Sequence, residues 1–185
     1  MELLSQINAL DLAILLALGG WFFVGWRRGV LRQLLGMAAF YVALVLGAQY
    51  HRIVSNWIMS MGSGATWVIV DAISFTLLFG VVLVVFNWVG YQVYRDTRVP
   101  FLKAVDNVLG GIFGVFTMVL ELIIGLSLLR FMVSVNWLEW ESLRQEVLQL
   151  FTASRLEDLL VNAAPALYVL IRPWLPAGLP AIFSF

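Results

Sequence analysis

The chain has 185 residues, of which 62% are apolar and only 12% are charged. Soluble domains carry about 25% charged residues, so this composition excludes an ordinary water-soluble globule, and it is too apolar for a soluble disordered chain. The absence of cysteine, the single histidine and the balanced charges exclude disulfides, a histidine-rich metal site within one chain and a basic surface for nucleic acid. We therefore expect an all-α integral membrane protein.

Apolar segments long enough to cross a membrane occur at residues 8–26, 33–50, 65–94 and 107–129. A hydrocarbon core of about 30 Å requires about 20 helical residues. Four such helices in so short a chain leave no protein mass that could bury them. The sequence therefore predicts a membrane-embedded four-helix bundle formed by residues 1–130.

Basic side chains between these segments predict the orientation of the chain. They are Arg27, Arg28 and Arg32 in the first loop and Arg95, Arg98 and Lys103 in the third. Loops rich in lysine and arginine stay in the cytoplasm, so we expect both termini outside. The interpretation that we favour for the Arg27–Arg32 hairpin is topology setting with contact to anionic lipid, and a specific partner site is the alternative.

Residues 131–185 are expected to form extracytoplasmic amphipathic or interfacial helices and a proline-rich tail. Residues 139–151 place apolar side chains on one helical face, which is typical of a helix on the outer leaflet or on a partner. Ser154 and Glu157 have the spacing of a capping box, which predicts that a new helix starts there.

The apolar stretch 159–171 is too short to span a membrane, and Pro165 is expected to kink it. The pattern leaves open whether this stretch is re-entrant or interfacial. Three further prolines predict an extended tail beyond it: Pro173, Pro176 and Pro180.

Glycines recur on one face of the fourth segment, at Gly110, Gly114 and Gly125. Small residues at this spacing allow a neighbouring backbone to approach closely. The second segment carries Gly36 and Gly47 in a similar arrangement. We expect these glycines to form helix-packing seams that close the bundle or join copies of it.

Acidic residues interrupt the apolar segments at Asp11, Asp71 and Glu121. An acid near mid-membrane costs roughly 2.5–3.5 kcal/mol, so it suggests function by default. In one interpretation the three acids converge in an outward-facing vestibule that binds protons or cations. In the favoured one each acid is protonated or paired with His51, Arg52 or Arg130.

Two other polar residues have simpler interpretations. Asp106 begins the fourth helix and is expected to cap its N-terminus. His51 is expected at the membrane interface and not as a metal ligand. The sequence shows no nucleophile–base set, metalloprotease motif or phosphate loop, so we expect no enzyme, no cofactor and no metal.

Two motifs resemble the colicin V production protein (CvpA) family over residues 8–130. One is Asp11 followed by the Gly-x-Arg-Arg-Gly-x-x-Arg hairpin of residues 25–32, and the other is the stretch 106–110 with Gly114 one turn later. The resemblance implies a four-span inner-membrane protein linked to colicin V production or export and to envelope homeostasis. Some relatives add a trypsin-like protease domain, which these residues lack, and Glu121 stands where an apolar or small residue is expected.

Together these features predict a non-catalytic inner-membrane protein that acts through assembly with its own copies or with other membrane subunits. Two alternatives remain open at this stage. The chain is a small proton or cation conductor that uses the three buried acids, or it is a structural subunit of a larger membrane complex.

Overall fold

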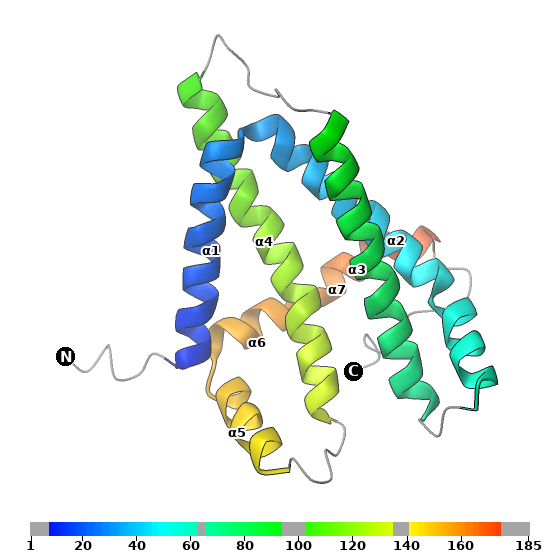
Figure 1. The fold of residues 1–185 in the computed structure, drawn as a ribbon. Helices are drawn as coiled ribbons and strands as arrows, with labels where there is room; N and C mark the ends of the chain where they lie inside the picture. Colours follow the sequence, from blue (N-terminus) through cyan, green and yellow to red (C-terminus); the bar gives the residue numbers. More distant parts are fainter. Residues whose placement is uncertain (1–7, 63–65, 94–102, 135–140, 175–185) are drawn as a thin grey trace.

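The computed structural model describes residues 8–62, 66–93, 103–134 and 141–174 (Figure 1). Within these ranges it contains helices and turns and no strand. The long helices are α1 (Ala9–Arg28), α2 (Val30–Ser60), α3 (Trp67–Val93) and α4 (Lys103–Ser134). All four are long and apolar enough to cross a membrane. The expected all-α class with four membrane-spanning helices is therefore confirmed.

Two of the helices extend well beyond the predicted apolar segments. The second was expected to end at Tyr50 but continues to Ser60, and α2 and α4 contain 31 and 32 residues. At about 1.5 Å per residue these helices are about 46 and 48 Å long, so they tilt or project from a core of about 30 Å. Hydropathy falls after Tyr50, but no proline or glycine stops the helix until Gly62. His51 and Arg52 consequently lie within α2 and not in a loop.

The four long helices form two packed pairs. α1 packs along α4, α2 packs along α3, and contacts between α2 and α4 join the two pairs (Figure 1). The apolar core includes Phe40 and Leu44 of α2, Phe75 of α3 and Ile123 of α4, each at most 3% exposed. Phe79 extends it, because its ring stacks on Phe75 with the centroids 5.9 Å apart.

A single residue separates α1 from α2. Gly29 has a φ of +82°, a left-handed conformation that costs little only for glycine. The chain can therefore reverse direction without a loop, and the hairpin arginines lie on the last turn of α1 and the first turn of α2. We call this the basic end of the bundle. The opposite end, which carries the start of α1, the end of α2, the start of α3 and the end of α4, is called the far end (Figure 1).

The C-terminal part is helical, and none of its described helices is long enough to cross a membrane. It consists of α5 (Glu141–Thr152), α6 (Arg155–Asn162), α7 (Ala164–Ile171) and the 3-10 turn η2 (Arg172–Trp174). The expected start of a helix after Ser154 is confirmed, since its Oγ accepts a hydrogen bond from the Glu157 amide at 3.0 Å. The break between α6 and α7 falls at Ala163, two residues before Pro165, which supplies no amide hydrogen.

Helices α6 and α7 lie against the bundle, from the start of α1 towards α2 (Figure 1). Leu160, Val161 and Leu167 are buried in the same core as the long helices. The last described residue of the segment, Trp174, contacts α2, because Gln49 Nε2 donates to the Trp174 carbonyl at 2.9 Å. The stretch 159–171 is thus part of the packed structure across the bundle.

Other expectations for this region need correction or fall outside the described residues. Pro173 lies in the short turn η2 and not in an extended tail, whereas Pro176 and Pro180 lie beyond the described residues. The amphipathic helix begins at Glu141. Of its predicted apolar face, Phe151 is buried and Val147 packs against the core, whereas Leu143 and Leu150 remain more than 40% exposed, so the described residues cover only part of that face.

The closest packing in the fold is the glycine seam between α1 and α4. A Cβ atom on Gly110 would lie only 2.5 Å from the Gly25 carbonyl oxygen and 2.9 Å from Gly29 Cα. One turn further along α4, a Cβ on Gly114 would lie 2.6 Å from the Trp21 carbonyl oxygen. These neighbours are backbone atoms, so no side-chain adjustment would relieve the overlap. The two backbones can approach this closely only because both positions are glycine.

The remaining predicted seam glycines behave differently. A Cβ on Gly47 would meet Phe79 Cβ at 3.3 Å, so Gly47 contributes a close contact between α2 and α3. Gly36 is looser, with Asn87 Oδ1 4.0 Å from its Cβ position, and a Cβ on Gly125 would meet nothing within 4 Å. The assignment of Gly125 to a seam is therefore wrong within the chain, because α1 has diverged from α4 at that level (Figure 1).

Replacing Gly114 with alanine is expected to destabilise the bundle, because its methyl group would overlap the Trp21 backbone. Overpacking of this kind costs typically about 1–3 kcal/mol. The matched control Gly125→Ala adds the same methyl group where space is open, and should leave stability unchanged or raise it by up to about 1 kcal/mol, because alanine favours a helix over glycine. Unfolding in detergent followed by circular dichroism measures both, and equal effects would contradict the seam.

Candidate functional site

The three acids of the apolar segments do not meet in the structure, and only Asp71 is fully buried. Asp11 lies in the first turn of α1 and accepts hydrogen bonds at Oδ1 from the Ser154 hydroxyl at 2.5 Å and the Leu156 amide at 3.1 Å. These donors belong to the N-terminus of α6, whose free amides and positive dipole end favour a carboxylate. Asp11 thus anchors the C-terminal segment to the first span.

Asp71 belongs to a separate buried cluster between α2 and α3. Its Oδ1 accepts from the Ser55 hydroxyl at 3.2 Å and lies 3.4 Å from His51 Nε2. His51 is only 1% exposed, and its Nδ1 lies 2.8 Å from the Ala48 carbonyl oxygen. His51 is therefore buried in the protein beside Asp71, and its depth in the membrane stays a prediction.

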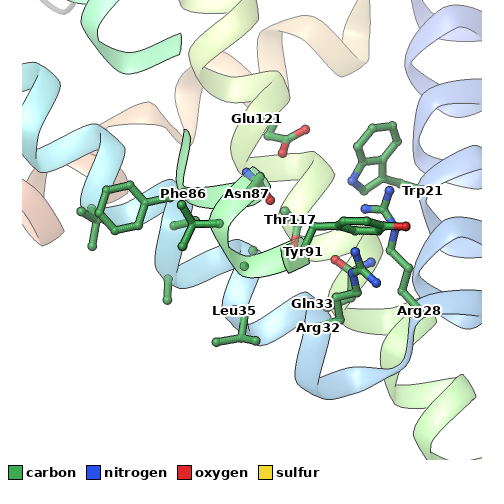
Figure 2. A pocket seen from close by; sticks show the side chains of 16 residues that line it. Trp21, Arg28, Arg32, Gln33, Leu35, Phe86, Asn87, Tyr91, Thr117 and Glu121 are labelled. Atoms are coloured by element: carbon green, nitrogen blue, oxygen red, sulfur yellow. The ribbon is translucent and has the colours of Figure 1, made fainter. Parts of the chain in front are cut away.

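Glu121 occupies the deep wall of a cavity between all four long helices. The cavity has a volume of about 520 Å³. Glu121 and Thr117 line it from α4, and Trp21 lines it from α1 (Figure 2). This acid is therefore neither at the far end with Asp11 nor beside Asp71. The common vestibule envisaged for the three acids is not formed.

Two arginines of the basic hairpin line the same cavity. Arg28 comes from the end of α1 and Arg32 from the first turns of α2 (Figure 2). The Arg32 guanidinium carbon lies 4.6 Å above the centre of the Tyr91 ring of α3, a cation–π contact. Arg27 is the third hairpin arginine but is not among the lining residues. The hairpin thus directs Arg28 and Arg32 to a space between the helices.

Gln33 is the most unusual polar side chain of this cavity. Its residue is only 4% exposed, and within the described residues its Nε2 has no hydrogen-bond partner. A buried amide without a partner costs roughly 1–3 kcal/mol, so it signals a missing acceptor. Gln33 also touches the glycine seam, because its Nε2 would lie 3.4 Å from a Cβ on Gly114.

Asp106 caps a helix, but not its own. Helix α4 already starts at Lys103, and Asp106 Oδ1 accepts from the Val30 amide at 3.0 Å. Gly29, the N-cap residue of α2, has no side chain, so α2 depends on this carboxylate from α4. The prediction that Asp106 caps the fourth helix is therefore wrong. Its partner lies 76 residues away, which no local sequence pattern could reveal.

Sequence reasoning also missed the burial of Glu157. This residue is 2% exposed, and its Oε1 lies 3.8 Å from Arg130 Nη1 of α4. Burial raises the pKa of Glu157 above its ordinary value, although Arg130 opposes that effect and Asp158 adds to it. The capping-box spacing identified Glu157 as a helix residue, but only the packing of α6 on α4 buries it.

The described residues include no group of three or more histidine, aspartate or glutamate side chains placed to hold a metal ion. The polar features of the fold are therefore two capping carboxylates, the buried Asp71 cluster and the cavity at the basic end. Two of these regions offer space for a ligand: the cavity at the basic end, of about 520 Å³, and a second cavity of about 550 Å³ that Arg130, Ser154 and Glu157 line.

The fold and the cavity define a class: an all-α membrane protein with four candidate spans. The chain matches the family model described as Colicin V production protein over residues 10–165, which is most of its length. It therefore belongs to the colicin V production protein family, as the two motifs suggested. No curated protein and no solved structure matches the chain.

Removing the carboxylate of Asp106 is expected to loosen the start of α2. Asp106→Ala should lower the free energy of unfolding by about 1 kcal/mol, the usual effect of losing a helix cap. Asp106→Asn keeps an oxygen that can accept from the Val30 amide and should cost less. Thermal unfolding in detergent distinguishes the two variants, and identical losses would argue against the cap.

Glu157 gives a prediction for pH dependence. Its folded-state pKa is raised, so the folded state binds the proton more tightly than the unfolded state, and stability falls as pH rises from about 4.5 through the raised value. Glu157→Gln should remove this component of the pH dependence. The difference in unfolding temperature between wild type and variant, measured across that range, checks it. A difference that does not change with pH would contradict the raised pKa.

Proposed function

We propose that this chain is a non-catalytic inner-membrane protein that serves colicin V production or export and envelope homeostasis through assembly in the membrane. Its partners are copies of itself or other membrane subunits. Its basic end faces the cytoplasm, because Arg27, Arg28 and Arg32 gather there. The family match over residues 10–165 of a chain with four candidate spans is the observation that carries this proposal.

The openness of the bundle supports assembly. Only 11% of the residues in the most apolar window of α1 are buried within the chain, and no more than 33% in any of the four spans. Leu16 and Phe23 of α1 and Val84 of α3 are each more than 65% exposed. In a membrane, these exposed apolar faces must contact either lipid or the helices of other subunits.

The geometry gives less support to proton or cation conduction. Asp11 is engaged with the N-terminus of α6, Asp71 with Ser55, and Glu121 lies in a third location. A conduction path needs polar groups in close succession, whereas these acids are dispersed among separate local structures. The assembly proposal requires no such path.

The assembly is tested by the native mass of the protein in gentle detergent, together with cysteine cross-linking in membranes. The chain contains no cysteine, so single substitutions report on one position each. Leu16→Cys and Val84→Cys sample the exposed faces of α1 and α3, and Ser74→Cys, which is 0% exposed, is the buried control. We expect a mass above that of one chain and cross-linked products from at least one face, but none from the control.

A mass equal to one chain, with no co-purifying protein and no cross-link from any exposed position, would contradict assembly. A proton or cation flux in proteoliposomes that is lost in Glu121→Gln would instead favour conduction. The two results concern different properties of the protein and can be obtained from the same preparation.

A further inference from the structure

The cavity at the basic end combines groups that attract an anion. Arg28 and Arg32 line it, and the buried Gln33 presents an amide nitrogen without a partner in the described part of the chain. Guanidinium groups bind phosphate and carboxylate through paired, charge-assisted hydrogen bonds. The Gln33 nitrogen itself is buried against Gly25 and Gly114, so the two guanidinium groups are the donors that the cavity offers.

These donors are held in place by the fold. Gly29 reverses the chain within one residue, so Arg28 and Arg32 lie on either side of a tight turn. The Asp106 carboxylate fixes that turn through the Val30 amide, and the Tyr91 ring lies beneath the Arg32 guanidinium. A binding group held in this way loses little conformational entropy when a ligand arrives.

Most of the remaining lining of the cavity is apolar, with Asn87 and Thr117 as its other uncharged polar side chains. Leu35, Ala39 and Val42 of α2 face Phe86 and Val89 of α3 across it. A small hydrophilic anion would leave these side chains in contact with water. An amphiphile with an anionic head and an apolar body matches both parts of the lining.

We propose that this cavity binds the phosphate group of an anionic phospholipid, with its acyl chains along the apolar wall between α2 and α3. Arg28 and Arg32 donate to the phosphate oxygens. The formal charges of Arg28, Arg32 and Glu121 sum to +1, which complements the single negative charge of a phosphodiester. Basic pockets between spans on the cytoplasmic side are typical sites for anionic lipid heads. This inference goes beyond the proposed assembly and shares with the proposed function only the cytoplasmic placement of the basic end.

The test uses the full chain purified in a neutral detergent and titrated with phosphatidylglycerol, with phosphatidylcholine or with inorganic phosphate. Native mass spectrometry counts the bound lipid, and thermal unfolding gives the affinity. We expect phosphatidylglycerol to bind at least about tenfold more tightly than phosphatidylcholine, and inorganic phosphate to compete only weakly.

Substitutions then locate the site. R28Q/R32Q should weaken phosphatidylglycerol binding by about tenfold or more, because charge-assisted hydrogen bonds are lost. R28K/R32K keeps the charges that set topology and should bind with intermediate affinity, since lysine cannot make the paired contact. The matched control is Arg52→Gln, which removes the same charge from an exposed position on α2 outside the cavity and should bind as the wild type does.

Three results would overturn the proposal. Equal binding of phosphatidylglycerol and phosphatidylcholine would remove the role of the anionic head, and saturation by inorganic phosphate alone with no lipid retained would remove the role of the acyl chains. Unchanged lipid affinity in R28K/R32K and R28Q/R32Q would place the bound lipid elsewhere. If R28Q/R32Q fails to fold, the lipid affinity of R28K/R32K alone still shows whether the lipid binds at these arginines.

Discussion

The close approach of the α1 and α4 backbones is the constraint on which the rest of the structure depends. Gly110 and Gly114 bring α4 against the carbonyl groups of Gly25 and Trp21, leaving no room for a Cβ atom. This contact places the last turn of α1 over the first turns of α4. The chain reverses there at Gly29, so the start of α2 and its arginines are fixed by the same contact. The α1–α4 contact therefore also sets the positions of the helices that line the cavity.

Acidic residues in the apolar segments serve mainly to join elements that are distant in sequence. Asp106 of α4 caps α2, and Asp11 of α1 caps α6. In each case a carboxylate meets free amides at the positive end of another helix, which satisfies both groups where water is scarce. Asp71 similarly links α2 to α3 through Ser55. Of these four acids, only Glu121 lies on the wall of a cavity, whereas Asp11, Asp71 and Asp106 connect helices to one another.

The sequence was sufficient for the fold class and for the existence of four spans, because helix length and hydrophobicity are local properties of each segment. Hydropathy could not predict that α2 continues to Ser60, since a helix persists in polar sequence until a residue such as Gly62 stops it. The spacing of Gly110 and Gly114 indicated a packing face but could not name α1 as the partner. The true role of Asp106, the burial of His51 and the composition of the cavity all depend on pairings between distant segments.

Solid-state NMR of the protein in lipid bilayers tests the α1–α4 contact most directly, without any substitution. Trp21 is the only tryptophan followed by phenylalanine, so ¹³C-carbonyl tryptophan with ¹⁵N-phenylalanine singles out its carbonyl group, and ¹³Cα-glycine supplies the partner. Because a Cβ on Gly114 would lie 2.6 Å from the Trp21 oxygen, we predict a carbonyl cross-peak to Gly114 Cα. Transfer to Gly25 Cα within α1 is the internal control. A spectrum that shows Gly25 but not Gly114 would contradict the contact and the arrangement of helices built on it.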